Sequence, residues 1–324
     1  MTKLFFAGAE YRNLAETLAR YDVKSILVSY YYIGMRGREN FIDEIQAKYP
    51  AIQWFLDSGA YTYAMAKKES SDSGRLLPVE EFVSRYFQYI DDRGSKFCRI
   101  AEPDFDNNEY TDVDEAKVHV WREVMLSQWP NLPITPVWNG YRRIEAWSEY
   151  CADDRIKHLA ISGGYMKNIG HMAVMAHKAH ACGKTVHGFG VTKASILQKV
   201  RFDTVDSTTW FACQKFGVIY VWKGTKMIAY HSRGQGKKDR KKFSKYLKAI
   251  GCDIQKVMDD DTDEVRKCNV TSWRIFGERL EEAQKRRAWV TIDRTEGKPS
   301  VPLKERCDEL RREHARLLER IEGD

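Results

Sequence analysis

The chain has 324 residues, with 53 Lys and Arg against 46 Asp and Glu, a net charge of +7. This length allows one large α/β domain with a tail, or two ordinary domains, and it suffices to bury a sizeable core. No window approaches eighteen apolar residues, and the first eight residues lack the basic start and apolar length of a signal peptide. We therefore expect neither a membrane span nor a secretory signal.

The cysteines are odd in number and widely scattered, and no C-x-x-C pair occurs. This usage favours neither a disulfide framework nor a zinc knuckle, so we expect a protein of a reducing, cytoplasmic compartment. The seven cysteines lie at positions 98, 151, 182, 213, 252, 268 and 307.

Eight short apolar runs alternate with amphipathic segments over the first two hundred residues. Strands interleaved with helices predict βαβ units and a parallel sheet. Eight strands favour a closed (β/α)₈ TIM barrel, in the α/β class, over a doubly wound Rossmann-type sheet, whose Gly-rich fingerprint is missing after the first run. The predicted strands are Lys3–Gly8, Ser25–Tyr31, Gln53–Asp57, Phe97–Glu102, Ile134–Trp138, His158–Ser162, Thr185–Phe189 and Phe202–Asp206. Helices are predicted at Glu10–Arg20, Glu39–Lys48, Val79–Asp91, Asp114–Ser127, Tyr141–Tyr150 and Ile169–Ala181.

The pattern changes after the eighth strand. Two apolar runs joined through Lys223-Gly224 predict a β-hairpin over residues 217–231. A basic segment and two helical patterns, near residues 263–287 and 303–321, follow it. We therefore predict a catalytic barrel over residues 1–232, which includes the hairpin, and a basic, mainly helical extension over residues 233–324. The last helix either packs on the barrel or forms a homodimer contact.

Acidic residues stand at the ends of three predicted strands: Asp57, the Glu102-Pro103-Asp104-Phe105-Asp106 stretch, and Asp206. Each alone could be a turn or a helix cap. Three of them at one barrel mouth favour a catalytic role over three separate caps, because TIM barrels keep their active sites at the carboxyl ends of the strands. Asp203 is expected on the same face as Asp206, which is preferred as the nucleophile because it is closer to the mouth.

Histidines offer a weaker signal. His177 and His180 have a spacing that could bind a metal, but a surface helix explains them better. His187 ends the seventh strand, where it either lines the pocket or fills it. We expect no metal at the site.

The basic segment after the hairpin contains eight Lys or Arg and one acidic residue, Asp239, between Ser232 and Ile250. Such a run is ordinarily a solvated surface. Because it follows the presumed catalytic face, we predict that it neutralises phosphates of a polymeric substrate. The predicted phosphate contacts are Arg233, Lys237, Lys238, Arg240, Lys241 and Lys242.

At these residues the sequence resembles the tRNA-guanine transglycosylase superfamily. Leu56–Tyr61 is similar to that family's Asp-Ser-Gly-Gly-Phe/Tyr element, and Phe202–Ser207 to its nucleophile strand. Ile161–Tyr165 resembles the Gly-Gly strand end that lines the base pocket. Val137–Gly140 is similar to the Val-Gln-Gly element, and His187–Val191 to the Met-Gly-Val-Gly stretch. The motifs cover about residues 50 to 232.

The resemblance implies a pentosyltransferase that replaces guanine in a nucleic acid through a covalent glycosyl-enzyme. It implies that Asp206 is the nucleophile and Asp57 the general acid/base. Base-binding positions would be Asp104, Asp106, Asn139, Gly163, Gly164, Tyr61, Tyr165 and His187.

The family's Cys-x-Cys-x-x-Cys…His zinc motif is absent, and Cys252 and Cys268 alone cannot reproduce it. We therefore expect no structural zinc and no cofactor. The short, zinc-less form is most similar to the phage and bacterial DNA-guanine transglycosylases of the DpdA type. The expected partners are DNA, in preference to tRNA, and a free 7-deazaguanine base, in a bacterial cell or a phage-infected host. A tRNA-acting transglycosylase and a non-catalytic nucleic-acid-binding subunit are the alternatives.

Overall fold

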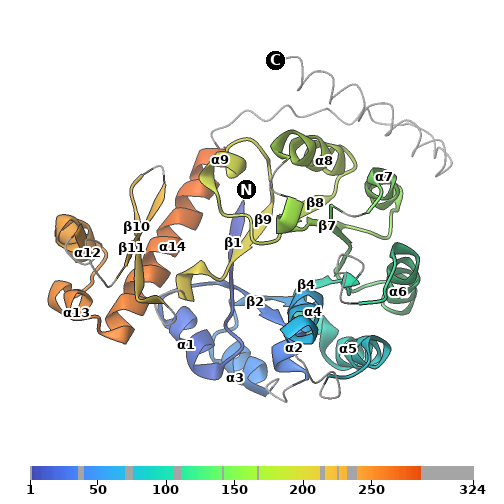
Figure 1. Ribbon diagram of the computed structural model, residues 1–324, viewed down its shortest axis with the longest axis horizontal. Coiled ribbons are helices and arrows are strands. Elements are labelled where there is room, and N and C mark those ends of the chain that lie inside the picture. The colour runs from blue at the N-terminus through green and yellow to red at the C-terminus, as the bar shows by residue number, and fades with distance from the viewer. Residues whose placement is uncertain are drawn as a thin grey trace.

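The computed structural model describes residues 2–35, 40–69, 76–105, 111–140, 142–165, 168–211, 216–224, 226–231 and 239–285. Its strands form a parallel barrel surrounded by helices (Figure 1). The predicted TIM-barrel class is therefore confirmed. The strands are β1 (Lys3–Ala7), β2 (Ser25–Ser29), β3 (Gln53–Asp57), β4 (Phe97–Ala101), β5 (Ile134–Thr135), β6 (Val137–Trp138), β7 (His158–Ile161), β8 (Thr185–Gly188) and β9 (Thr204–Ser207).

The strand order β5-β4-β3-β2-β1-β9-β8-β7-β6 closes into a ring because its two end strands are halves of one predicted strand. Pro136 separates them and has no N–H to give to a sheet. Its carbonyl still accepts the N–H of Ala160 at 2.9 Å, so β7 stays joined at the break. The predicted strand at 134–138 thus exists, but pairs with β4 through one half and with β7 through the other.

Strand residues point alternately into the barrel and toward the helices, and the residues on both sides are largely buried. Every residue of β2 is buried, as parallel strands covered on both faces require. Inside the barrel, Phe5, Leu27, Phe55 and Val137 belong to a small apolar cluster. A much larger cluster lies between the strands and the helices.

The helices cover the outside of the ring (Figure 1). In α5 (Val79–Arg93), apolar residues recur at three- and four-residue spacing, which gives the helix one buried face. The other helices around the barrel are α1 (Arg12–Arg20), α2 (Tyr30–Ile33), α3 (Asn40–Lys48), α4 (Ala60–Glu69), α6 (Glu115–Gln128), α7 (Ile144–Ala152), α8 (Ile169–Ala181) and α9 (Ala194–Leu197). The short helices α2 and α9 were not predicted, nor was α4, whose apolar residues show little periodicity.

The predicted hairpin is present as β10 (Val218–Trp222) and β11 (Met227–His231), which pair antiparallel. It carries the short helices α12 (Ser244–Ala249) and α13 (Ile254–Met258) on one face, where Ile219 and Val221 join a separate apolar cluster. Figure 1 shows this unit projecting from one side of the barrel.

The long helix α14 (Thr262–Lys285) returns from that unit to the barrel and lies between α1 and α9 (Figure 1). Val270, Trp273, Phe276 and Leu280 belong to the main core cluster. At Gly277 an added Cβ would lie 3.2 Å from the Leu4 Cβ, so the helix packs closely on β1. The extension predicted from residue 233 therefore includes a helix, α14, that packs on the barrel. This helix occupies the place of the helix after the eighth predicted strand. The pattern at 303–321 lies outside the described residues.

Candidate active site

The two predicted catalytic carboxylates lie at the carboxyl ends of their strands. Asp57 is the last residue of β3, and Asp206 is the third residue of β9. Only β2 and β1 separate these strands in the barrel. The two groups are near enough for the charge of Asp206 to act on the titration of Asp57. The structure therefore brings both predicted residues to one barrel mouth.

Asp206 is held by two partners from the loop and strand beside it. The N–H of Gly190 donates to its Oδ1 at 2.7 Å, and the Nε2 of His187 lies 3.3 Å from the same oxygen. The residue is buried, with 7% of its surface exposed. These contacts fix one carboxylate oxygen, and the side chain is positioned before any substrate arrives.

His187 lies inside the barrel and is fully buried. Its ring packs edge-on against Phe55 and Phe189, with centroid distances of 4.8 and 4.5 Å. Burial lowers the pKa of His187, against the opposing effect of Asp206, so the ring is neutral near pH 7. A neutral ring that donates from Nε2 to the Asp206 carboxylate must accept at Nδ1, where the Thr204 hydroxyl lies at 2.8 Å. The sequence left open whether His187 lines the pocket or fills it. Because its side chain is fully buried, His187 fills the barrel interior and contacts Asp206 from there.

Asp57 has the opposite environment. Burial, followed by the charge of Asp206, raises the pKa of Asp57 to about 7, although the N–H of Gly59 donates to its carboxylate at 3.2 Å. Gly59 has φ +80°, and an added Cβ would lie 2.6 Å from the Ser29 Oγ and from the Tyr31 Cβ. Only glycine fits this turn, which places an N–H beside the carboxylate.

Glu10 is a third carboxyl group at this mouth, and sequence analysis placed it in a helix instead. The observed helix begins at Arg12, and Glu10 lies in the loop after β1 with 7% of its surface exposed. Its Oε1 accepts the N–H of Ser29 at 3.3 Å, and its charge further raises the pKa of Asp57. An acidic residue two positions after a predicted strand was the available signal.

Three other predicted base-binding positions follow the carboxyl ends of strands. Asp104 follows β4, is half-buried, and acts together with Asp57 to raise the pKa of the buried Tyr86 beyond the effect of burial. Asn139 follows β6, is 1% exposed, and its Oδ1 accepts the N–H of Arg142 at 3.2 Å. Tyr61 is 71% exposed in the first turn of α4, directly after the Asp57 turn.

Gly163 and Gly164 begin the short 3₁₀ helix η4 (Gly163–Tyr165) after β7. An added Cβ on Gly163 would lie 2.2 Å from the carbonyl oxygen of Phe189, so this glycine lets the β7 and β8 loops touch. Gly164 is exposed. Asp106 and the side chain of Tyr165 lie outside the described residues.

Two acidic residues of the same strand ends serve other purposes. Glu102 is fully buried; it accepts from Arg122 Nε at 2.6 Å and also pairs with Arg142. Its carboxylate therefore holds α6 and the loop before α7 to the barrel and is not free to read a base. The expectation for Asp203 is wrong, because it is three positions before Asp206 and strand alternation puts the two side chains on opposite faces. Asp203 bonds His180 of α8 at 2.7 Å and the N–H of Val186 at 2.7 Å.

The predicted phosphate contacts also divide into a buried residue and exposed ones. Arg240 is fully buried and is a correction to the prediction, because its guanidinium pairs with Asp260 and donates to the carbonyls of Val257 and Gly217. Lys241 and Lys242 are exposed, and Lys242 also pairs with Asp239 at 2.6 Å. Arg233, Lys237 and Lys238 lie outside the described residues.

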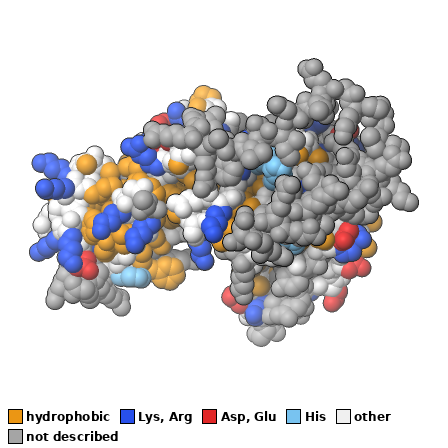
Figure 2. Space-filling model, turned by 90° about the horizontal axis from the view of Figure 1, so that it is seen from above, with side chains coloured by type: hydrophobic (Ala, Val, Ile, Leu, Met, Phe, Trp, Pro, Cys, Tyr) orange, Lys and Arg blue, Asp and Glu red, His pale blue; other side chains and the backbone are white. Residues whose placement is uncertain are grey.

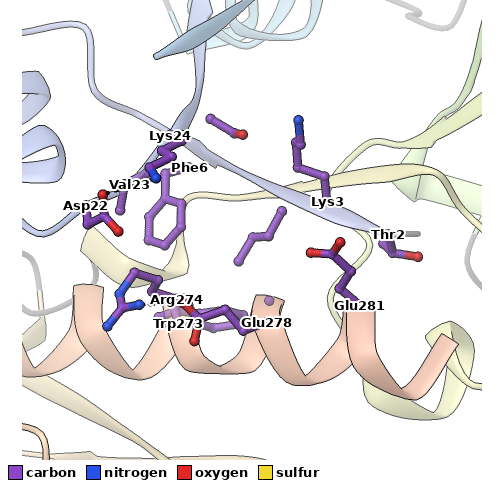
Figure 3. Close-up of a pocket in the computed structure, with 13 residues that line it drawn as sticks. Thr2, Lys3, Phe6, Asp22, Val23, Lys24, Trp273, Arg274, Glu278 and Glu281 are labelled. Carbon is purple, nitrogen blue, oxygen red and sulfur yellow. Dashed lines mark hydrogen bonds and ion pairs between the residues drawn. The ribbon is translucent and has the colours of Figure 1, made fainter. Parts of the chain in front are cut away.

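Within the described ranges, no group of three or more His, Cys, Asp or Glu side chains is arranged to hold a metal ion. Nor is any described helix long and apolar enough to cross a membrane. Figure 3 shows a cleft at the opposite, amino-terminal end of the barrel, between β1 and α14, with a volume of about 230 Å³. Its walls carry both signs of charge, including Lys24 and Glu278, and neither Asp57 nor Asp206 lies there.

Comparison with known proteins adds little to this geometry. No family model matches the chain, and no curated protein matches it. Among solved structures, it is similar to an enolase from the environmental genome shotgun sequencing of the Sargasso Sea, with 10% identity and a TM-score of 0.37. The match covers 71% of this chain and 62% of the enolase, so the chain spans less than two thirds of that protein.

Proposed function

We propose that the protein is a nucleic-acid guanine transglycosylase, which exchanges guanine in DNA for a 7-deazaguanine through a covalent intermediate on Asp206. One observation carries the proposal: two carboxyl groups share the barrel mouth, and burial and mutual charge raise the pKa of one of them to about 7. Two carboxyl groups in unlike environments suit a nucleophile and a proton-transfer partner. The family resemblance supplies the substrate class.

In the first half of the reaction, the target guanosine leaves its stack, because its C1′ is inaccessible within a duplex. The Asp206 oxygen that Gly190 and His187 do not bind attacks C1′. The bond from C1′ to the guanine N9 breaks, and its electron pair leaves with the base. Protonated Asp57 gives its proton to the departing guanine, which leaves neutral.

In the second half, a 7-deazaguanine takes the place of guanine. Ionised Asp57 removes the proton from N9 of the incoming base, N9 attacks C1′, and the ester bond to Asp206 breaks. Two displacements at one carbon give overall retention, as in retaining glycosidases. A pKa of about 7 suits Asp57 because it must give and take a proton at equal cost near neutral pH.

The remaining positions are assigned by placement and chemistry. Asp104 would accept hydrogen bonds from the Watson–Crick edge of the purine, and the backbone of Gly163 and Gly164 would contact the base. Tyr61, exposed beside the Asp57 turn, would stack on it. Exposed Lys241 and Lys242 would contact phosphates. The preference for DNA over tRNA comes from the resemblance alone.

The test is exchange of labelled guanine, with trapping of the covalent adduct. Asp206→Asn should abolish both exchange and a denaturation-resistant adduct, while binding of the polymer is kept. Asp203→Asn is the matched control, because this carboxyl lies on the same segment but bonds His180 and Val186. It should leave exchange within about threefold of the parent protein.

Normal exchange by Asp206→Asn would reject the assignment of the nucleophile. Offering duplex DNA and tRNA in parallel separates the two polymer choices. Tight binding of either polymer without exchange of any base would favour the non-catalytic subunit instead.

A further inference from the structure

A second cavity lies between the barrel and the hairpin, beside the candidate active site. Its volume is about 420 Å³, within the range of small-ligand sites. On the barrel side its wall begins at Thr208 and Thr209, which follow the last residue of β9. Thr208 is two residues from Asp206, and two extended residues span at most about 7 Å. The cavity, here called the hairpin groove, therefore adjoins the barrel mouth.

The pairing of the hairpin explains its other wall. Val218 pairs with His231, and Tyr220 pairs with Ala229, so these four side chains lie on one face of the two-stranded sheet. That face lines the groove, whereas the opposite face, with Ile219 and Val221, is covered by α12 and α13. The hairpin thus uses one side for its own core and presents the other to the groove.

Three aromatic side chains, those of Phe211, Phe216 and Tyr220, line the groove. Phe216 is 65% exposed, an unusual state for phenylalanine. The Tyr220 ring is fixed from behind by Trp273 of α14, with ring centroids 5.7 Å apart. The threonine hydroxyls and His231 add polar groups at the same place.

The chain from the start of the hairpin to the end of α12 is rich in lysine. Between Phe216 and Ile250, the described residues include six exposed lysines and one acidic residue, Asp239. Figure 2 shows Lys and Arg spread among hydrophobic side chains over the part of the molecule where Figure 1 places the hairpin, α12 and α13. Four of these lysines lie in or just before α12, on the hairpin face opposite the groove, and no Lys or Arg is among the described residues that line it. The aromatic rings are therefore what suits the groove to a base of single-stranded nucleic acid, because base–aromatic stacking tolerates any sequence. The exposed lysines are Lys223, Lys226, Lys241, Lys242, Lys245 and Lys248.

We propose that the hairpin groove binds an unpaired base next to the extruded guanosine, with Phe216 as the stacking platform. This inference rests on the proposed function, because it places the neighbouring nucleotide by reference to C1′ at Asp206. Stacking on a ring serves any base, since every base has a π-face. The groove would therefore keep the target nucleotide's neighbour out of the duplex without specifying its identity.

The experiment uses a DNA hairpin oligonucleotide, and its RNA counterpart, with a loop guanine flanked by 2-aminopurine. Binding is measured by anisotropy, and stacking by loss of 2-aminopurine emission. Phe216→Ala should raise Kd about tenfold and restore the emission. Phe216→Tyr should keep both within about twofold of the parent protein. Val120→Ala, at a residue 58% exposed on α6, is the control for loss of an exposed apolar side chain.

An unchanged Kd and emission for Phe216→Ala would overturn the inference, and so would a parent protein that binds neither oligonucleotide. The failure of the proposed function looks different. In that case the parent protein shows Phe216-dependent quenching, but neither it nor Asp206→Asn exchanges guanine or forms an adduct. If Phe216→Ala still exchanges guanine and binds the oligonucleotide with the affinity of the parent protein, the proposed function stands and the role of the hairpin groove is rejected.

Discussion

Asp57 and Asp206 have the same side chain at the same end of the barrel, and their neighbours make them chemically different. Asp206 has an N–H donor at 2.7 Å and a neutral His187 beside one oxygen. Asp57 is more strongly affected by burial and by the charge of Asp206 than by the single N–H of Gly59. One carboxyl is thereby suited to attack and the other to carry a proton.

The raised pKa of Asp57 predicts a pH-dependent loss of stability. Its folded pKa of about 7 lies above the unfolded value of about 3.9, so between these values the folded state binds more protons and stability falls as pH rises. Asp57→Asn removes that ionisation and keeps an oxygen for Gly59. Relative to the parent protein, the variant should gain about 2–3 kcal/mol between pH 5 and pH 8. Urea unfolding at both values measures this; a pH-independent difference would contradict the raised pKa.

The crowded turn at Gly59 predicts a loss of stability on substitution, and Gly224 provides the control. Both Gly59 and Gly224 have positive φ, +80° and +76°, but an added Cβ meets nothing within 4 Å at Gly224. Gly224→Ala should therefore cost only the backbone term, about 1 kcal/mol. Gly59→Ala adds the clash with Ser29 and Tyr31, for a total of about 2–4 kcal/mol. Chemical denaturation measures the free energy of unfolding of both variants. Equal losses of this free energy would show that the Asp57 turn is not crowded.

At the scale of elements, the site is built where strand ends meet close-packed loops. The β7 and β8 loops touch because Gly163 has no side chain to meet the Phe189 carbonyl. That contact supports the loop whose Gly190 N–H holds Asp206. The hairpin unit depends on a different contact, since buried Arg240 joins the segment before α12 to α13 and to Gly217 before β10.

Arg240 therefore predicts a structural rather than a binding phenotype. Arg240→Ala leaves Asp260 and two carbonyl groups without their partner and should destabilise the hairpin unit by about 3 kcal/mol. The adjacent Lys241→Ala, at an exposed side chain, should change stability by less than about 0.5 kcal/mol. Limited proteolysis between residues 217 and 260 compares the two. Cleavage rates that match would contradict the structural role of Arg240.

At the scale of the whole molecule, α14 makes the barrel and the hairpin unit one body. Its Trp273 and Phe276 pack against Tyr220 and Trp222 of β10, and its Gly277 packs on β1. The helix thus closes the ring of helices at the place where the chain's first and eighth barrel strands meet.

Ending the chain at residue 232 should therefore prevent cooperative folding, although the eight barrel strands remain. The truncation removes Val270, Trp273, Phe276 and Leu280 from the main core and exposes the outer face of β1. A chain of residues 1–285 should unfold in one cooperative transition near that of the full chain. Calorimetry compares the two chains. A sharp thermal unfolding transition for residues 1–232 would show that these residues fold without α14, and would support the domain boundary predicted from the sequence.

The sequence by itself determined the barrel. Period and length of the apolar runs, with Gly and Asp at their ends, placed all eight strands, because parallel strands buried on both faces need continuous apolar residues. The same reasoning located Asp57 and Asp206, since a residue at a strand's carboxyl end comes to the mouth wherever the ring closes. The hairpin was also predictable from its local turn.

Only the tertiary structure decided what each charged side chain contacts. It placed Glu102 and Arg240 in pairs with a buried side chain and Asp203 in a half-buried pair, and it brought Glu10 beside Asp57. It also returned α14 to β1 across the whole hairpin unit. Pairing and desolvation depend on residues far apart in the chain, and strand or helix periodicity carries no information about such partners.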